Sequence, residues 1–458
     1  MEPRTPHLIR SQVRRQIEQG TQNQEGHLNS NTVTRQFKRS FDESTLNQLG
    51  KATRFCWRER EATPFRLMLA LIQGFATEPL NWIADLHRTF NRLNGREVQY
   101  KPFHNQLAKP GFPRFVREVL NRLLNELSCE VLRFDERSPF ARFEAVRIQD
   151  GTSFGLKKTL AKAFPGRFTT VSPAAVELHV DFDLLHEGVQ NVVLAPDVLP
   201  ERPFLPPPKT LRNQLLLADR GYFAAAYFQA LEAAGASFIM RGAANLKPIV
   251  VEAFDEQGHP LPKWVGHRLH ELRKHFAKHS CVDLTVHLKT RKGAIDCRLI
   301  MRRTLRPDER ISYLYTNLPR EHFTPEQVGD AYRLRWQIEL LFKEWKSHAN
   351  LRAFDTSNPH LAEGLIWASL CAAVLKRYCA HAVEAITGAA LSTQRVAKCG
   401  HHVLKDILYA LRHGLRTLKT CVKRAIIYLA SNAKRAHPDR DRRSGRHKLD
   451  LCPRHAQA

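Results

Sequence analysis

Residues 332–346 read YRLRWQIELLFKEWK, and their spacing predicts an amphipathic helix with an unusual polar strip. On a helix that turns by about 100° per residue, an arc of about 60° holds all of Tyr332, Arg335, Glu339 and Lys346. An apolar stripe lies opposite, made of Leu334, Ile338, Leu341 and Trp345. Trp336 and Leu340 flank the strip on its other side, so we expect it to face a site rather than open solvent. The simpler interpretation is a set of helix salt bridges, because Arg335 and Glu339 form an i,i+4 pair.

The residues before this stretch predict where its helix begins. Thr324-Pro325-Glu326-Gln327 has the form of a capping box with proline at the first helical position. We therefore expect one helix that starts after Thr324 and runs through Lys346.

Two aspartates follow predicted strands further upstream. Val146, Ile148 and Asp150 share one face of an alternating strand that ends in Asp150-Gly151-Thr152, and an unbroken apolar run leads to Asp219. Ligand sites of open α/β sheets lie at the carboxyl ends of strands, and paired aspartates suit hard cations such as Mg²⁺. The alternative is that each aspartate caps a turn.

Glu339 is the third carboxylate that could form a metal site with these two aspartates. Together the three carboxylates could hold two divalent metals that activate a water or a DNA 3′-hydroxyl for in-line phosphoryl displacement. Arg335 and Lys346 could then clamp phosphates, and Tyr332 could stack on or hydrogen-bond to a terminal nucleotide.

The overall charge also points to a polyanionic partner. The 458 residues hold 71 Lys and Arg against 45 Asp and Glu, a net charge of +26. Such an excess favours nucleic acid, because phosphate neutralisation dominates nucleic-acid affinity.

The nine scattered cysteines and the polar N-terminus fit a reducing cytoplasm, and the apolar run Leu365–Leu375 is too short to span a bilayer. A zinc site at Cys399, His401 and His402 is disfavoured for want of a second ligand pair.

Composition divides the chain into six parts. Helical spacing in residues 46–140 is compatible with a helix-turn-helix DNA reader or equally with a plain bundle. One strand alternates apolar residues with a wetter face of Glu177, His179, Asp181 and Asp183, and we expect Asp181 and Asp183 to be peripheral. The predicted parts are a flexible polar arm (1–45), the helical region (46–140), an α/β core (141–242 and 318–350), a β-rich insertion (243–317), a helical C-terminal region (351–430) and a basic disordered tail (431–458).

These residues resemble the DDE transposases of bacterial insertion sequences, in the subgroup with the signature Y-x2-R-x3-E-x6-K. Tyr332, Arg335, Glu339 and Lys346 have those spacings, and Asp150-Gly151-Thr152 and Leu217–Tyr222 resemble the segments around the two catalytic aspartates. The spacing from Asp219 to Glu339 is 339 − 219 = 120 residues, and the subgroup carries a β-rich insertion at this point. The resemblance covers roughly residues 60–420.

The resemblance implies a ribonuclease-H-like core whose catalytic and metal-binding residues are Asp150, Asp219 and Glu339. It further implies two Mg²⁺ ions, for which Mn²⁺ can substitute, and cut-and-paste chemistry at terminal inverted repeats by a homodimer on bacterial nucleoid DNA. Some members form a hairpin intermediate with help from a stacking aromatic, for which Trp264 is the insertion's candidate.

Three hypotheses remain distinct at this point. The first is an active transposase, the second a decayed copy that binds DNA as a repressor, and the third a nuclease of the same core without joining activity. The intact Asp150, Asp219 and Glu339 argue against decay. Lys157, Lys158 and Lys162 follow Asp150 closely and face either DNA or solvent.

Overall fold

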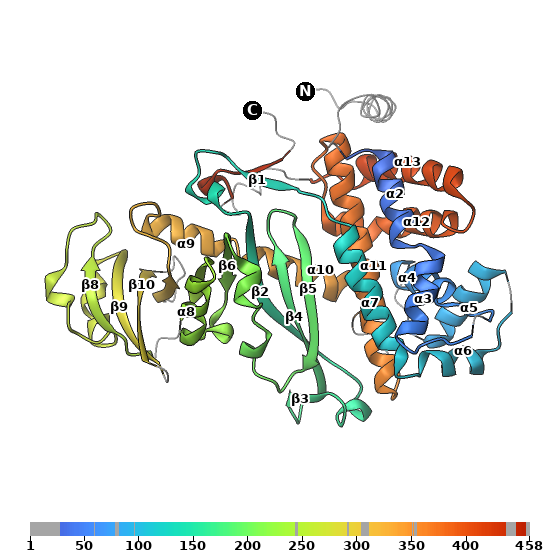
Figure 1. The fold of residues 1–458 in the computed structure, drawn as a ribbon, viewed down its shortest axis with the longest axis horizontal. Coiled ribbons are helices and arrows are strands. Elements are labelled where there is room, and N and C mark those ends of the chain that lie inside the picture. Colours follow the sequence, from blue (N-terminus) through green and yellow to red (C-terminus); the bar gives the residue numbers. More distant parts are fainter. Residues whose placement is uncertain are drawn as a thin grey trace.

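A computed structural model of the chain describes residues 28–454, apart from 59, 78–81, 96, 243–245, 291–292, 304–310, 350, 352–354 and 437–445. A long mixed sheet has a helical bundle beside one end, and the short helix α8 (Ala225–Ala233) lies near the middle of the sheet (Figure 1). The sheet has ten strands in the order β3-β4-β2-β6-β7-β11-β10-β9-β8, with β5 also paired to β4.

The middle of the sheet is built from two kinds of pairing. β2 (Ala145–Gly155), β4 (Ser172–Asp183) and β5 (Gly188–Pro196) form an antiparallel meander. β6 (Gln214–Ala218) then pairs parallel to β2, and β7 (Ser237–Arg241) pairs parallel to β6. The spatial order is thus third, second, first, fourth, fifth, which is the ribonuclease-H arrangement. The predicted α/β class with this core is confirmed.

The sheet continues with strands from the segment expected to be an insertion. β11 (Ile311–Thr316) pairs with β7, and beyond it lie β10 (Gly293–Arg303), β9 (Cys281–Thr290) and β8 (Ile249–Phe254), all antiparallel. These four strands fall in the segment predicted to be β-rich, residues 243–317. This segment therefore extends the edge of the central sheet.

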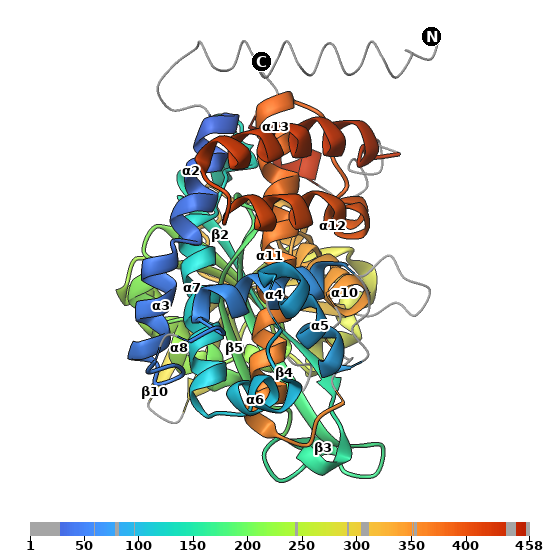
Figure 2. The ribbon, with the colours of Figure 1, turned by 90° about the vertical axis from the view of Figure 1, so that its right-hand side faces the viewer.

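Helices from both ends of the chain share one bundle. Figure 2 shows the N-terminal helices beside the long α11 and the C-terminal α12 and α13. Gly364 of α11 lets Phe112 of α7 approach so closely that an added Cβ would lie 2.2 Å from its ring. Among the described residues, no helix is both long and apolar enough to cross a membrane. The helices are α2 (Ser30–Ser40), α3 (Glu43–Ala52), α4 (Pro64–Thr77), α5 (Ile83–Asn94), α6 (Tyr100–Leu107), α7 (Gly111–Glu126), α11 (Pro359–Thr387), α12 (Thr393–Ala410) and α13 (Leu415–Asn432).

Residues 30–45, for which the polar composition predicts a flexible or weakly helical arm, form the packed helix α2 and the start of α3. Asn29 caps α2 through its side chain, and the α2 residues Val33 and Phe37, together with Phe41 just after the helix, are buried. Because these apolar residues recur every fourth position, they form one stripe that packs on the bundle, with the Phe37 ring 5.7 Å from that of Tyr378. Residues 1–27 lie outside the described part of the chain.

The predicted disordered tail is also wrong for residues 446–453. β12 (Leu451–Pro453) pairs antiparallel with β1 (Leu132–Phe134), and Leu449 and Leu451 are buried. Arg446 forms an ion pair with the buried Glu187 and donates to Gln337 Oε1 at 2.8 Å. Two apolar side chains and one buried ion pair thus hold a segment whose composition alone is basic and polar.

We expect Arg446→Ala to lower the free energy of unfolding by about 3 kcal/mol, because it takes the paired arginine away from a buried carboxylate. Burial by itself raises the pKa of Glu187, but Arg446 and its neighbours hold that pKa well below the usual value. Chemical denaturation measures the loss. Arg137→Ala removes a cation of an exposed ion pair with Asp135 and should change little. Equal stabilities of the two variants would contradict this account of the tail.

Candidate active site

Asp150 and Asp219 lie side by side where two parallel strands separate. The last paired residues of β2 and β6 are Gln149 and Ala218, so the aspartates that follow them are at the same level. The strand predicted to end in Asp150-Gly151-Thr152 is longer than expected, because β2 continues to Gly155 with β4 as its partner. The parallel pairing of β2 with β6 ends at Gln149 and Ala218, and the opening beyond this pair gives the two carboxylates their common position.

The signature residues lie on two helices rather than the one that the spacing predicts. α9 (Pro325–Arg333) begins at the predicted capping box, in which Thr324 and Gln327 bond reciprocally, and α10 runs from Trp336 to His348. Between them the N–H groups of Leu334 and Arg335 bond to carbonyls three residues back, each at 3.0 Å. This tighter turn separates the helices but leaves the polar strip facing the sheet.

Three side chains of the strip contact the strand carboxylates or each other. The Tyr332 hydroxyl donates to Asp219 Oδ1 at 3.1 Å. Arg335 donates from Nη1 to Asp150 Oδ2 and from Nη2 to Glu339 Oε1, the latter at 2.6 Å. The predicted carboxylates from β2, the β6 loop and α10 are therefore gathered around one guanidinium. Lys346, the fourth residue of the strip, is half-buried two turns further along α10.

Burial and mutual repulsion govern the charges of the site. Burial raises the pKa of Asp150 to about 6, against the lowering effect of Arg335 and the Gly151 N–H. Asp219 and Glu339 raise that pKa further, so the three carboxylates lie within range of each other's charge. Arg335 lies between Asp150 and Glu339 and offsets this repulsion. Burial lowers the pKa of Arg335, but the neighbouring anions raise it by more, so this pKa lies above the usual range.

A divalent cation fits the chemistry of these donors but not their present spacing. Carboxylate oxygens are the ligands that Mg²⁺ prefers. In the part of the chain that the structure describes, however, no three His, Cys, Asp or Glu side chains converge closely enough to hold a metal. Asp150 would have to exchange Arg335 for the cation.

Arg241 is a neighbour of the site that the sequence analysis missed. It ends β7, and its Nη1 lies 3.9 Å from Asp219 Oδ1. Its position at the carboxyl end of the strand next to β6 was the available signal. Its side chain is 42% exposed, which leaves it accessible to a ligand of the site.

The opposite face of β2 holds a buried polar cluster where a wetter face was expected. Nδ1 of His179 lies 2.8 Å from the hydroxyl of Tyr222, and its ring stacks on Phe204 with centroids 3.8 Å apart. Burial lowers the pKa of His179 to about 4 and raises that of Glu177 to about 7. A Cβ on Gly151 would lie only 2.4 Å from Glu177 Oε1. Glycine next to Asp150 therefore lets Tyr222, from the loop after Asp219, anchor beneath β2.

The remaining candidates fall outside the site. As expected, Asp181 and Asp183 are peripheral, since they pair with Arg147 and His186 respectively. Trp264 is only 6% exposed and packs in the core of its segment, so the proposed stacking role does not fit its position. Trp336, which directly follows Arg335, is 52% exposed.

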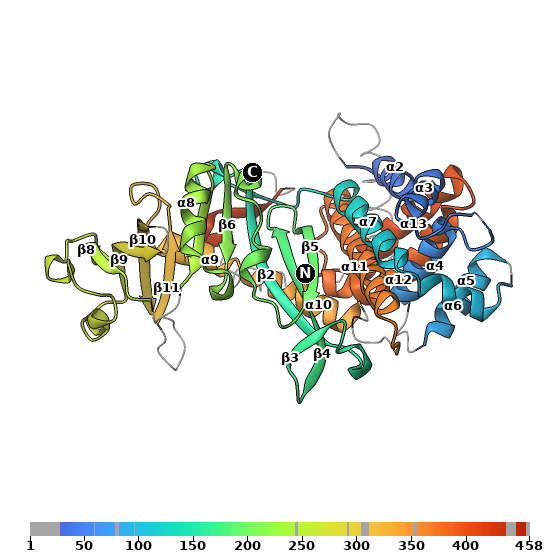
Figure 3. The same cartoon turned by 60° about the horizontal axis from the view of Figure 1, so that its bottom comes forward.

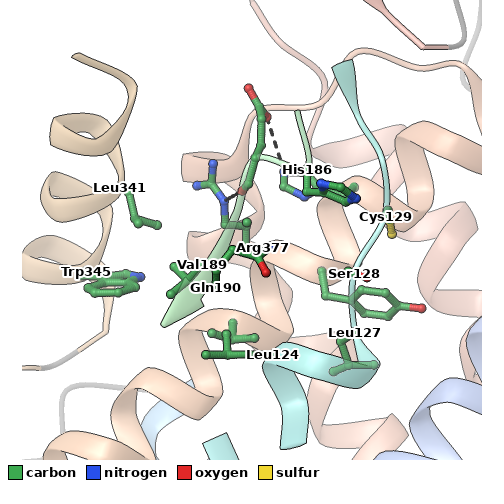
Figure 4. A pocket seen from close by; sticks show the side chains of 15 residues that line it. Leu124, Leu127, Ser128, Cys129, His186, Val189, Gln190, Leu341, Trp345 and Arg377 are labelled. Atoms are coloured by element: carbon green, nitrogen blue, oxygen red, sulfur yellow. Dashed lines mark hydrogen bonds and ion pairs between the residues drawn. The ribbon is translucent and has the colours of Figure 1, made fainter. Parts of the chain in front are cut away.

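A pocket behind α10 is separate from the carboxylates. Figure 4 shows it between α7, β5, α10 and α11, with Leu341 and Trp345 on one wall and His186 near Arg377 on another. Arg377 already donates to the Glu187 carbonyl at 2.6 Å and to Glu344 at 3.2 Å. The pocket is therefore a gap beside the buried ion pairs of the tail contact.

A known protein family matches the part of the chain that contains this site. The family model described as "Transposase DDE domain" matches residues 141–375, which include Asp150, Asp219 and all four residues of the polar strip. A solved synaptic complex of the piggyBac transposase with hairpin DNA aligns with a TM-score of 0.42 and 11% identity, over 85% of this chain and 84% of that chain.

Curated relatives agree with the family match. The transposase for insertion sequence element IS1151 of Clostridium perfringens is 24% identical over 352 residues, 69% of this chain and 73% of the relative. That for IS231C of Bacillus thuringiensis subsp. berliner is 24% identical over 368 residues, 72% and 75% of the two chains. The transposase for IS421 of Escherichia coli is 52% identical over 62 residues, 14% and 17% of the two chains.

We expect Gly151→Ala to destabilise the protein by about 1–3 kcal/mol, the usual cost of forcing a methyl group into a packed region. The new Cβ would collide with Glu177 and crowd the Tyr222 hydroxyl at 3.2 Å. Gly188→Ala is the matched control, because its Cβ would meet only ordinary contacts beginning at 3.5 Å. Thermal unfolding compares the two, and equal melting temperatures would show that β2 tolerates a side chain at position 151.

Proposed function

Because the chain belongs to the family of transposases with a DDE domain and is a DNA transposase, we propose that Asp150, Asp219 and Glu339 are its catalytic, metal-binding residues. The observation that carries this proposal is the bridge of Arg335 between Asp150 and Glu339, with Asp219 held by Tyr332. Three carboxylates that are distant in sequence thus lie within electrostatic range of one guanidinium. Such a concentration of negative charge is costly unless cations accompany it.

We infer that two Mg²⁺ ions, or Mn²⁺ in their place, bind these carboxylates. When bound, they supply Lewis acidity for a scissile phosphate and a nucleophile at neutral pH. The chain's own part is to hold the oxygens on rigid strands and a helix. Since Asp150 must release Arg335 when it takes up a cation, the guanidinium becomes available for a DNA phosphate, which it can bind in bidentate fashion.

The DNA-binding role falls in this proposal to Tyr332, Arg335 and Lys346. All three line the polar strip beside the carboxylates, and the chain's net charge of +26 favours a duplex partner. The DNA comprises the inverted repeats at the ends of the element and the target into which they are joined. We further propose that a homodimer holds two ends together, that the helical region 46–140 reads the end sequence, and that the protein works on nucleoid DNA.

The two alternative functions have less support. A repressor derived from a decayed copy has no need of three intact carboxylates gathered from separate elements. A nuclease without joining activity would have the same site, but the family and the curated relatives are transposases.

Replacing the proposed catalytic glutamate tests the assignment directly. We expect Glu339→Gln to slow Mg²⁺-dependent cleavage of DNA bearing the element's ends by about 100-fold or more, because losing ~3 kcal/mol of transition-state stabilisation has that effect. End binding in a gel-shift assay should persist. Glu326→Gln, an exposed position on α9, is the control and should cleave normally.

Two results would contradict the proposal in different ways. Cleavage by Glu339→Gln at the wild-type rate would remove Glu339 from the catalytic set. A wild-type protein that binds ends but never cuts them, in Mg²⁺ or Mn²⁺, would instead favour the repressor.

Lysines on two sides of α10 test the phosphate contact. We expect Lys346→Ala to reduce the slope of log affinity against log salt for end DNA by about 0.9, the value for one phosphate contact on duplex DNA. Lys343→Ala, an exposed position on another side of α10, should leave the slope unchanged. Titrations at several salt concentrations measure both slopes, and an unaltered slope for Lys346→Ala would exclude the contact.

A further inference from the structure

A two-stranded hairpin projects from the sheet beyond the catalytic carboxylates. It joins β3 (Pro165–Phe168) to β4 through the tip Thr169–Val171, and it stands clear of the body of the molecule (Figures 1 and 3). Its two large apolar side chains face solvent, with Phe168 67% and Val171 90% exposed. Exposed apolar groups at the end of a projection point to a partner surface.

The stem of this hairpin is held rigidly. Asp197 accepts hydrogen bonds from the Arg167 backbone N–H at 3.1 Å and from Ser153 Oγ at 2.6 Å, and the Arg167 guanidinium donates to its carbonyl. Gly166 lies at an irregular point of the pairing, where a Cβ would come within 2.0 Å of the Ser172 carbonyl oxygen. The tip is therefore presented in a fixed direction.

The chain that leads into the hairpin is rich in positive charge, although Arg167 itself pairs with Glu177. Between Asp150 and Glu177 the sequence has no acidic residue and four cations, namely Lys157, Lys158, Lys162 and Arg167. Lys157 pairs with Asp355, whereas the exposed Lys158 and Lys162 lie in the short segment that leads into β3. A rigid apolar tip with a cationic base complements a polyanion that has stacked apolar layers, which is duplex DNA.

We propose that the β3–β4 hairpin is a wedge for target DNA. Phe168 and Val171 insert between base pairs from the minor groove and kink the duplex, while Lys158 and Lys162 contact the phosphates alongside. The inference rests on the proposed function, because it assumes that the DNA being joined lies at the carboxylates.

The hairpin tip is too far from the carboxylates to contact the DNA bond that reacts there, so in this proposal it contacts the target DNA to one side of that bond. Asp150 pairs with Val180, eight residues along β4 from Ser172, which directly follows the tip. Eight residues of strand span about 26 Å, the length of roughly eight base pairs of duplex. The wedge thus contacts DNA away from the scissile bond and takes no part in the chemistry itself.

The side chains of the tip favour target DNA over the element's own ends. Phe168, Thr169, Thr170 and Val171 include none of the Arg, Asn or Gln residues that make bidentate contacts with base edges. A wedge of this kind selects for ease of deformation rather than for a base sequence. That property suits a partner without a fixed sequence.

The test replaces both apolar side chains with Phe168→Ser/Val171→Ser and separates the two reaction steps. We expect cleavage of element ends to be unchanged, and joining of pre-cut ends into an intact duplex to fall about tenfold. Targets with unpaired bulges, which bend easily, should restore joining. The control variant Val251→Ser/Val265→Ser removes two exposed apolar side chains from the far end of the sheet and should behave as wild type.

A direct probe uses target duplexes containing 2-aminopurine, whose fluorescence rises when a base step unstacks. Wild type should raise it and Phe168→Ser/Val171→Ser should not, a readout that stands even if no cleavage occurs. The proposal is overturned if the variant joins and unstacks like wild type, if its defect appears at end cleavage, or if light scattering shows a changed oligomeric state. An inactive wild type that still unstacks target DNA would refute the proposed function but not the wedge.

Discussion

The site depends on the contacts that the Arg335 guanidinium makes with two carboxylates. This guanidinium donates to Asp150 from β2 and to Glu339 from α10, and so joins the sheet to the helix that packs on it. Without a cation, the carboxylates of Asp150, Asp219 and Glu339 would repel one another within a partly buried space. The remaining features of the fold around them, namely the parallel pair β2–β6 and the tight turn between α9 and α10, bring these groups within reach of that one side chain.

Distant segments hold the two helices against the sheet from behind. Asp330 of α9 pairs with Arg302 of β10 at 3.5 Å and with Lys448 of the tail at 3.6 Å. Arg446 of the tail also reaches Gln337 at the start of α10. The outer strands and the C-terminal segment therefore have a structural effect on the site, because they fix the turn from which Arg335 extends. A basic composition concealed this role of the tail.

The helical period predicted the polar strip because it depends only on residues that are close together in the sequence. The apolar run before Asp219 predicted its strand because that pattern is also local. The break at Leu334 was not predictable, since a tightened turn leaves no mark on spacing and Arg335 beside it bonds to Asp150, which is distant in sequence. Nor was the buried cluster around His179, because polar residues alternating along a strand look the same whether water or a loop covers them. The burial of Phe37 depends on Tyr378, more than 300 residues away, which no local pattern reports.

β2 links the site to the projecting hairpin by a simple geometric constraint. At Asp150 the strand loses its parallel partner β6 but keeps β4, which is paired with β5 as far as Val176 and with β3 beyond that residue. This ribbon of strands has the Asp150 carboxylate at one end and Phe168 near the other. Because each strand residue advances the chain by about 3.3 Å, inserting or deleting a residue pair would shift the tip by roughly two base pairs along a duplex. The length of the ribbon therefore sets the spacing between the carboxylates and whatever the tip contacts.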